Sequence, residues 1–245
     1  MIIIEDLHKT FGDLSVLNGV SIDIREGEST VVMGKSGQGK SVLLKLIMRL
    51  MLPDAGRIIV DDEEISRLSN RSMDALRLRF GMLFQSAALF DSMNVADNVS
   101  ISLRTFGRRP EAEIQETTLR CLGKVGLEEV ADRFPAELSG GMKKRVGLAR
   151  AIAMDPQYIL YDEPTTGLDP VTSRQISELI KELQQELDVT SIIVTHDIPT
   201  GFYLADQIAL LNEGNFSFIG SVEEMKRSDN ALVQEFISGY QSERE

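Results

Sequence analysis

Two segments of the chain have the residue types of phosphate-binding loops. The first, GKSGQGKS at 34–41, fits the pattern G-x-x-x-x-G-K-[ST]. Its glycines would let main-chain N–H groups face phosphate oxygens, Lys40 would neutralise the β and γ oxygens, and Ser41 would ligate Mg²⁺. The expected nucleotide-binding residues are Gly34, Lys35, Ser36, Gly37, Gln38, Gly39, Lys40, Ser41 and Val42.

The second segment, LSGGMKKR at 138–145, stands just before a long helical pattern. Ser139, Gly140 and Gly141 would therefore lie at the start of a helix, where unpaired N–H groups and the positive end of the helix dipole favour an anion. A second phosphate-binding cradle is the expected result.

A pair of carboxylates ends an apolar segment, YILYDE at 158–163. Asp162 is suited to hold Mg²⁺, and Glu163 is placed to polarise an attacking water. Acidic residues at the end of a strand more often mark only a turn, so this pair depends on the motifs around it.

The elements that must position these residues alternate between strands and helices. Strand patterns cover much of 1–33, and helical spacing runs from Ser41 to Met51, so the P-loop has the strand–loop–helix context that it requires. Short buried strands are expected at 80–85, 158–162 and 191–195, and 92–154 is mostly helical. The alternation predicts a largely parallel sheet with a helical insert.

Composition limits the possible functions of this 245-residue chain. Its 26 Lys and Arg against 38 Asp and Glu give a net charge of −12, which disfavours a broad basic surface for nucleic acid. The single cysteine, Cys121, excludes an internal disulfide, and its spacing with Ile114, Thr118, Leu122 and Val125 places it on a packed helix face. The N-terminus lacks the pattern of a signal peptide, and we find no apolar run of about 20 residues.

The order of the motifs resembles that of ATP-binding cassette (ABC) ATPases over essentially the whole chain. An aromatic, Phe11, is followed by the P-loop, Gln85 in FQS, LSGG, YILYDE, PTTGLDP at 164–170 and THD around His196. The resemblance implies that Phe11 stacks on adenine, that Gln85 contacts Mg²⁺ and water, and that His196 contacts the γ-phosphate. The implied metal ligands are Ser41, Gln85 and Asp162, and the implied catalytic residues are Glu163, His196 and Gln85.

The same resemblance implies an α/β P-loop NTPase fold of the ABC ATPase type, with a mainly parallel core sheet, an N-terminal antiparallel β subdomain and a helical subdomain. Residues 1–245 would form one ABC ATPase domain, with 1–90 and 156–225 as the core and β subdomain, 91–155 as the helical signature subdomain, and 226–245 as a C-terminal helix and tail. ATP would lie between two head-to-tail subunits of a homodimer, and Ser139, Gly140, Gly141 and Asp169 would act on the partner's nucleotide.

Within the ABC ATPases, Met142 replaces the usual glutamine of the signature. With the flanking phrases GKSVLLK, GMLFQSAALFDSMNVADNV and YDEPTTGLDPVTS, the chain resembles the ATPases of MCE-type (mammalian cell entry) phospholipid transporters of the Mla system. This implies a membrane permease, an MCE substrate-binding protein, a small STAS-domain protein in some members, and a peripheral place on the cytoplasmic face of the inner membrane. An ATPase of a solute importer or of an exporter shares every catalytic motif and stays an alternative. A non-transport ABC ATPase fits less well.

Two segments each allow two structural interpretations. The segment 81–103 follows Gln85 and would receive the permease, and its apolar cluster at 87–90 and Met93 would form either a docking surface or ordinary core. Near the C-terminus, Leu232, Phe236 and Tyr240 recur every four residues on an expected helix, which would pack on its own domain or on another protein.

Overall fold

The computed structural model describes residues 1–107 and 109–242, with the side chains of 239–242 excepted. The chain divides into two compact units. Unit 1 comprises Met1–Arg77 and Thr190–Glu245, and unit 2 comprises Leu78–Val189. The subregion boundaries expected at 91 and 155 stay a prediction.

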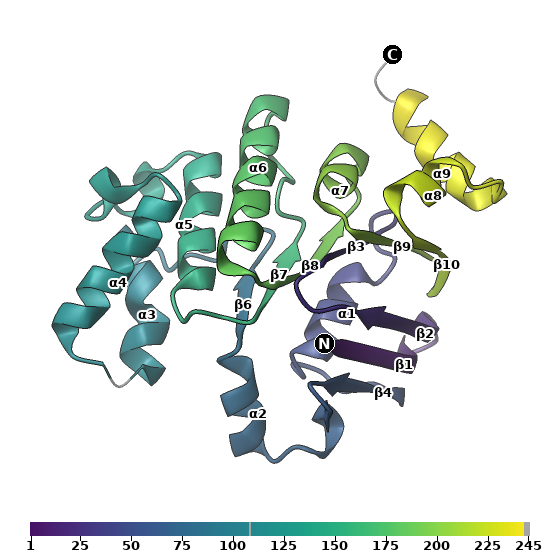
Figure 1. Ribbon diagram of the computed structural model, residues 1–245, viewed down its shortest axis with the longest axis horizontal. Coiled ribbons are helices and arrows are strands. Elements are labelled where there is room, and N and C mark those ends of the chain that lie inside the picture. Colours follow the sequence, from purple (N-terminus) through teal and green to yellow (C-terminus); the bar gives the residue numbers. More distant parts are fainter. Residues whose placement is uncertain (108, 243–245) are drawn as a thin grey trace. The chain divides into compact units, whose positions relative to one another are not determined.

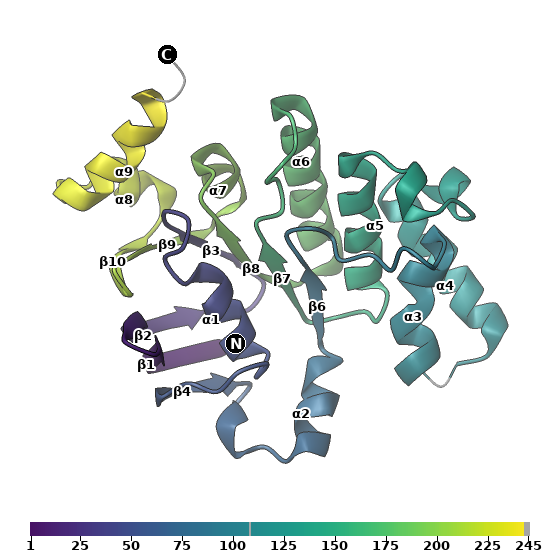
Figure 2. The ribbon, with the colours of Figure 1, turned by 180° about the vertical axis from the view of Figure 1, so that it is seen from behind.

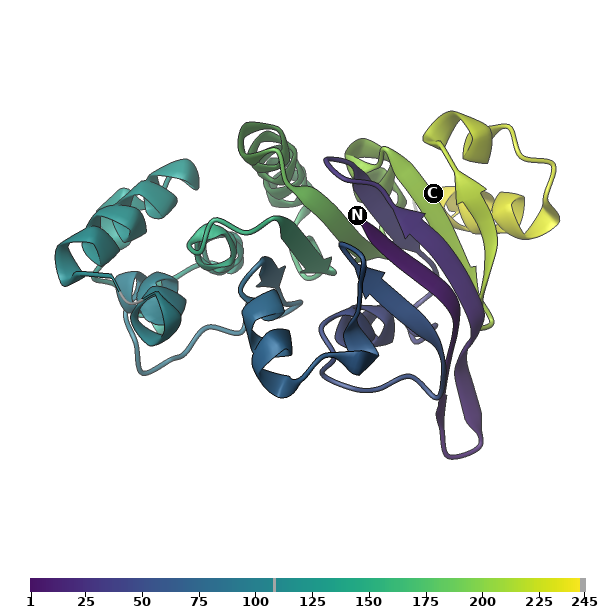
Figure 3. The same ribbon diagram turned by 60° about the horizontal axis from the view of Figure 1, so that its bottom comes forward.

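Unit 1 begins with an antiparallel sheet of four strands in the order β2-β1-β4-β5. Their bounds are Ile2–Phe11 (β1), Leu14–Ile24 (β2), Ala55–Val60 (β4) and Glu63–Glu64 (β5). β1 and β2 form a long hairpin whose tip projects from the rest of the sheet (Figure 3). This is the N-terminal antiparallel β subdomain that the resemblance to ABC ATPases implied.

The second sheet region of unit 1 is mainly parallel. β3 (Ser29–Met33) pairs with β8 (Thr190–Thr195) on one side and with β9 (Gln207–Asn212) on the other, and β10 (Asn215–Gly220) runs antiparallel to β9. Every residue of β3 and β8 is buried, as continuous apolar runs covered on both faces should be. Helix α7 (Ile198–Leu204) packs on β3 and β8 (Figure 2).

Helix α1 (Lys40–Ile47) follows the P-loop and contacts β8. It is shorter than the helix predicted to run to Met51, because Arg49 adopts a left-handed conformation (φ 47°) and Leu50 is exposed. The remaining helices of unit 1 are α2 (Asn70–Arg77), α8 (Val222–Lys226), α9 (Ala231–Ser242) and a 3₁₀ turn at Ile65–Arg67.

Unit 2 contains the parallel pair β6 (Phe80–Leu83) and β7 (Tyr158–Asp162) with four helices, namely α3 (Val95–Phe106), α4 (Glu111–Lys124), α5 (Gly140–Ile152) and α6 (Pro170–Leu187) (Figure 1). Two 3₁₀ turns, Glu128–Val130 and Pro135–Glu137, lie between α4 and α5. The helix α5 packs closely on β6: a Cβ built on Gly81 would lie 2.3 Å from the carbonyl oxygen of Ala151. β6 ends two residues before the predicted end at Gln85.

The predicted packed face of α4 is confirmed. All five of its residues are buried, and Cys121 is fully covered. Burial raises the pKa of the Cys121 thiol. This cysteine is therefore a core residue, as its spacing predicted.

The C-terminal helix α9 packs on β10 of its own unit. Of the residues expected on its apolar face, Leu232 is 45% exposed and Phe236 is only partly covered, whereas Val233, outside that spacing, is fully buried. The side chain of Tyr240 and residues 243–245 lie outside the described part of the chain.

Candidate nucleotide-binding and catalytic sites

The P-loop joins the end of β3 to the start of α1. Two of its glycines have no room for a side chain: a Cβ on Gly34 (φ 156°) would lie 2.5 Å from the Leu211 carbonyl oxygen, and one on Gly39 (φ 93°) would lie 2.6 Å from Cγ1 of Val16. Both also adopt conformations that residues with a side chain rarely take. The glycine spacing thus produces a tight turn that places main-chain N–H groups ahead of α1.

Lys40 is buried at the base of this loop. Its ammonium donates hydrogen bonds to the carbonyl oxygens of Gly34 (2.8 Å) and Lys35 (3.1 Å). The side chain therefore folds back across the loop, where phosphate oxygens would meet it. Gln38 and Lys35 are held from outside the loop: the side-chain oxygen of Gln38 accepts from the N–H of Glu213 (2.7 Å), and Lys35 pairs with Glu235 of α9 (3.1 Å).

His196 lies next to the start of the P-loop by strand register. Met33 of β3 pairs with Thr195 of β8, so Gly34 and His196 are the next residues along two neighbouring parallel strands. The imidazole is exposed and follows the carboxyl end of its strand, where ligands of parallel sheets bind. The structure therefore brings two of the predicted phosphate contacts together within unit 1.

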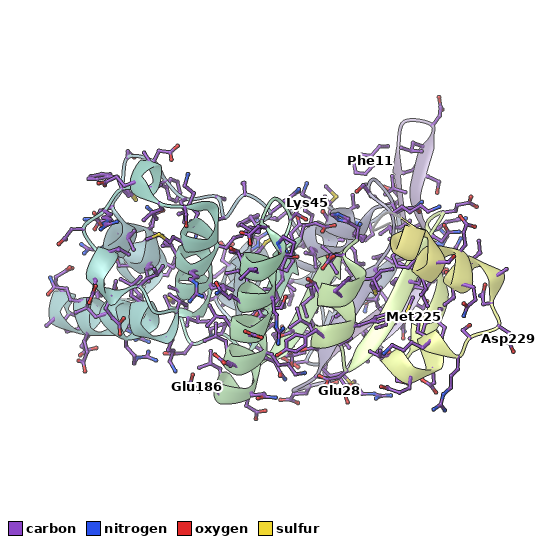
Figure 4. All side chains as sticks on the ribbon, turned by 90° about the horizontal axis from the view of Figure 1, so that it is seen from above. Phe11, Glu28, Lys45, Glu186, Met225 and Asp229 are labelled. Atoms are coloured by element: carbon purple, nitrogen blue, oxygen red, sulfur yellow. The ribbon has the colours of Figure 1, made fainter. Side chains whose placement is uncertain are left out.

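Phe11 ends β1 at the projecting hairpin (Figure 4). Phe11 is 46% exposed, and the ammonium of Lys9 lies 5.5 Å from the centroid of its ring. An exposed aromatic face of this kind can stack on a base. His8, the other histidine of the chain, pairs with the carboxylate of Asp6 (3.1 Å).

The carboxylate pair lies in unit 2, at the end of β7. Asp162 is its last residue, and Glu163 follows with a left-handed main chain (φ 48°). Both are buried, with Glu163 only 7% exposed. Thr166 holds Glu163 by donating its hydroxyl to Oε2 (3.1 Å) and its N–H to the carbonyl oxygen (3.3 Å).

Gln85 and Glu163 are brought together through their main chains. The ammonium of Lys144, in α5, donates to the carbonyl oxygen of Gln85 (2.6 Å) and to that of Glu163 (3.0 Å). The Gln85 side chain is exposed. The loop that carries Gln85 and the turn that carries Glu163 are therefore fixed to the same helix.

The signature segment forms the start of α5. Ser139 is the N-cap residue, and its hydroxyl accepts from the N–H of Met142 (3.3 Å). Ser139 and Gly140 are exposed, as a cradle for an anion requires. Gly141 is buried and packs so closely on Thr172 that a Cβ there would lie 2.6 Å from Cγ2 of Thr172. The signature thus abuts the start of α6.

Asp169 caps α6, a role that the sequence reading did not include. Its carboxylate accepts from the N–H groups of Val171 and Thr172 (both 3.0 Å) and from the Thr172 hydroxyl (2.5 Å). These hydrogen bonds, with that of the Thr172 side chain the largest contribution, lower the pKa of the Asp169 carboxyl. The cap and the predicted contact across a dimer are compatible, since the residue is exposed.

An apolar groove of about 400 Å³ lies beside the Gln85 loop. Of the predicted apolar cluster, Ala88 and Phe90 line it, whereas Ala87 is buried core. Three further lining residues, Phe84, Ile101 and Ser102, lie within the predicted segment 81–103. Sequence reasoning missed the other three, which are Thr105, Phe106 and Arg150. Phe106 is 56% exposed.

Several residues that hold the site were also missed. Arg150 donates to the carbonyl oxygens of Ala88 (2.7 Å) and Ala87 (2.6 Å), and Asn98 accepts from the N–H of Phe90 (2.7 Å). Lys144 was missed because it belongs to the run KKR, which suggests a solvated face. Its spacing of three and four residues from Gly141 and Leu148 could have revealed an inward orientation.

A P-loop that opens a helix, and a carboxylate pair that ends a buried strand, define the class of P-loop nucleotide-binding proteins. Comparison of the sequence with known families identifies the family within this class. The model described as "ABC transporter" matches residues 17–166, and the chain therefore belongs to the ABC transporter family, as an ATP-binding cassette ATPase.

Three relatives indicate how wide this family is. The chain is 41% identical over 239 residues to the intermembrane phospholipid transport system ATP-binding protein MlaF of Haemophilus influenzae, an alignment that covers 97% of this chain and 90% of the relative. It is 40% identical to a probable ribonucleotide transport ATP-binding protein of Mycobacterium leprae (96% and 68%). It is 42% identical to the methionine import ATP-binding protein MetN of Caulobacter vibrioides (92% and 68%).

Solved structures agree with the fold. A dimeric ATP-binding cassette in a post-hydrolysis state, bound to ADP and Pi, matches with a TM-score of 0.82 and 32% identity over 91% of this chain and 99% of that one. A cassette of Clostridium perfringens, part of an ABC transporter complex, matches with a TM-score of 0.85 and 32% identity over 96% and 94%. The expected ABC ATPase fold is confirmed. Among the residues that the structure describes, no helix is both long and apolar enough to cross a membrane.

Proposed function

We propose that this chain is the ATP-hydrolysing subunit of a phospholipid transporter, and that it works as a homodimer under a membrane permease. One observation carries the lipid assignment: the alignment with MlaF spans nine tenths of that relative, whereas those with the ribonucleotide and methionine relatives leave about a third of each uncovered. The identities to the three relatives are nearly equal, so the extent of the alignment is what supports the lipid proposal.

The catalytic proposal divides the residues into two groups. Lys40, the P-loop N–H groups and His196 bind the phosphates, and Phe11 stacks on adenine. Glu163 accepts a proton from the water that attacks the γ-phosphate, and Gln85 orients that water. The burial of Glu163 and its two hydrogen bonds with Thr166 support this role, because a general base must be held in one orientation.

Mg²⁺ fits the donors that the chain offers. Ser41, Gln85 and Asp162 supply a hydroxyl, an amide oxygen and a carboxylate, and Mg²⁺ usually takes one or two carboxylates together with substrate phosphates. Among the described residues there is no cluster of three His, Cys, Asp or Glu, so an all-protein metal cage is not formed there. When bound, the ion would neutralise charge that develops on the β and γ oxygens.

The second phosphate cradle motivates the dimer. The exposed N-terminus of α5, with Ser139 and Gly140, offers N–H groups and a positive dipole end to an anion. In the homodimer these residues, Gly141 and Asp169 would contact the ATP bound to the partner's P-loop. The dimeric state of the ADP-bound relative supports this arrangement.

The groove beside Gln85 is the proposed permease site. It is apolar, it is lined by exposed Phe84, Phe90 and Phe106, and its wall includes the loop that carries Gln85. A helix of the permease would bury these rings, and its movement would reach the nucleotide through that loop. The complex would hold the chain at the cytoplasmic face of the inner membrane, with an MCE protein and, in some systems, a small STAS-domain protein as further partners.

A methionine or other solute importer is the second candidate, favoured by the 42% identity to MetN. Purification of the tagged chain from detergent-solubilised membranes, followed by mass spectrometry of the copurifying proteins, separates the two. A permease with an MCE protein is the expected result. A permease with a solute-binding protein would replace the lipid proposal by the importer.

A further inference from the structure

Lys144 is a buried cation for which the proposed function has no role. It is 4% exposed, and it lies on α5, one turn after the signature glycines. Burial lowers the pKa of its ammonium to about 8, and the carboxylates of Asp162 and Glu163 act against that shift. Placing a lysine here costs desolvation energy, so the contacts that its ammonium makes must compensate for it.

Those contacts join two catalytic segments that are far apart in sequence. The ammonium bridges the carbonyl oxygens of Gln85 and Glu163 at 2.6 and 3.0 Å. A charged donor forms stronger hydrogen bonds to carbonyl oxygens than a neutral donor does. Lys144 thereby fixes the distance between the end of β6 and the turn after β7.

Glu163 needs such support because its main chain is strained. A non-glycine residue at φ 48° is in a sparsely populated main-chain conformation, which persists only where its surroundings hold it. Hydrogen bonds from Thr166 and from Lys144 are among the contacts that hold it. Without Lys144, the Glu163 carbonyl oxygen would lose its charged donor and keep the longer hydrogen bond from the Thr166 N–H (3.3 Å), so the turn that carries the carboxylate would be held less firmly.

The same face of α5 holds the Gln85 loop along its length. Lys144, Gly147 and Arg150 recur every three residues, which places them on one side of the helix. A Cβ on Gly147 would lie 2.6 Å from Leu83, and Arg150 binds the carbonyl oxygens of Ala87 and Ala88. The loop thus lies directly against α5, and Lys144 is the member of this row that also reaches Glu163.

We propose that Lys144 is a positioning residue for hydrolysis, which holds the strained main chain of Glu163 and that of Gln85 in the orientation that places the general base against the attacking water. The inference rests on the proposed role of Glu163. It assigns no contact with ATP to Lys144 itself.

The test compares Lys144→Met with Arg145→Met in the full-length chain. Arg145 lies on the same helix and donates to a main-chain carbonyl, that of Val125 (2.9 Å), which belongs to no catalytic segment. Both substitutions remove a cation and its carbonyl hydrogen bonds from α5. We expect kcat of Lys144→Met to fall on the order of 10- to 100-fold while KM for ATP changes less than about twofold, and Arg145→Met to keep its kcat.

A purely structural role would give a different pattern. Thermal unfolding is measured for both variants, and Lys144→Gln, which keeps a donor but is too short to bridge both oxygens, replaces Lys144→Met if the latter does not fold. Unchanged kcat in a folded Lys144 variant would overturn the proposal. So would an equal loss of kcat in Arg145→Met.

The double variant with Glu163→Gln gives the decisive readout. Because Lys144 acts through Glu163, its loss should add less than about twofold to the defect of Glu163→Gln in single-turnover hydrolysis of radiolabelled ATP. Multiplication of the two defects would contradict the positioning role. Normal turnover by Glu163→Gln alone would instead refute the general-base assignment, so the two failures are distinguishable.

Discussion

Met33 and Thr195 are paired in parallel register across β3 and β8, and this pairing sets Gly34 of the P-loop beside His196. Two residues more than 160 positions apart in the sequence thus begin adjacent loops at the carboxyl edge of one sheet. The P-loop and the exposed His196 therefore follow the ends of two neighbouring parallel strands. Binding of a nucleotide's phosphates at this edge is what the register predicts.

Lys40→Ala should weaken ATP binding by about 10- to 100-fold, since hydrogen bonds to a charged group contribute about 1.5–3 kcal/mol. In the structure its ammonium already lies within the loop, bonded to the carbonyl oxygens of Gly34 and Lys35. Titration calorimetry with ATP measures the loss. Lys45→Ala, which removes an exposed lysine from the same helix (Figure 4), is the control and should bind normally. Equal affinity in both variants would contradict the role of Lys40.

Asp169→Asn removes the carboxylate charge but keeps a side-chain oxygen that can cap α6. An asparagine caps a helix about as well as an aspartate, so at neutral pH it should keep more stability than Asp169→Ala. The lowered pKa of Asp169 means that its ionised form stabilises the fold above the ordinary carboxyl pKa near 4, and that this contribution is lost as the pH falls through the lower folded-state pKa. Urea unfolding between pH 7 and pH 3 should show the difference between the natural chain and Asp169→Asn shrinking only in the acid range. A constant difference would show that the hydrogen-bonded carboxylate contributes nothing.

Phe106→Asp should abolish association with the permease and leave ATP binding unchanged. The ring is exposed and lines the groove, so a charge there costs the fold little but opposes an apolar partner. Leu119→Asp, at an exposed leucine of α4 outside the groove lining, is the matched control. Copurification from solubilised membranes is the measurement. Retention of the permease by Phe106→Asp would place its docking site elsewhere.

Much of the fold could be predicted because local patterns determine it. The strand at 158–162 and the buried face around Cys121 follow from runs of apolar residues and from helical spacing. The P-loop could be predicted because its glycine spacing is typical of a tight phosphate-binding turn. Such features depend on near neighbours in the chain, which the sequence displays directly.

The missed features depend on tertiary contacts. The main chain is left-handed at both Ala87 and Ala88. The Ala87 side chain therefore enters the core while that of Ala88 lines the groove, and no periodicity in the sequence indicates this difference. On α9, which packs on β10, Val233 is buried and Leu232 is exposed, because the position of the helix on the sheet selects the face. The bridge from Lys144 joins three segments that only the folded chain brings together.

The central test is whether ATP makes the Glu163→Gln variant dimerise. Its molar mass is measured by light scattering coupled to size-exclusion chromatography. This variant should bind ATP and lose nearly all turnover. Because the γ-phosphate is then retained between the P-loop of one subunit and Ser139–Gly141 of the other, ATP with Mg²⁺ should convert it from monomer to dimer. A protein that binds ATP yet stays monomeric, or that hydrolyses ATP at the natural rate, would contradict the account.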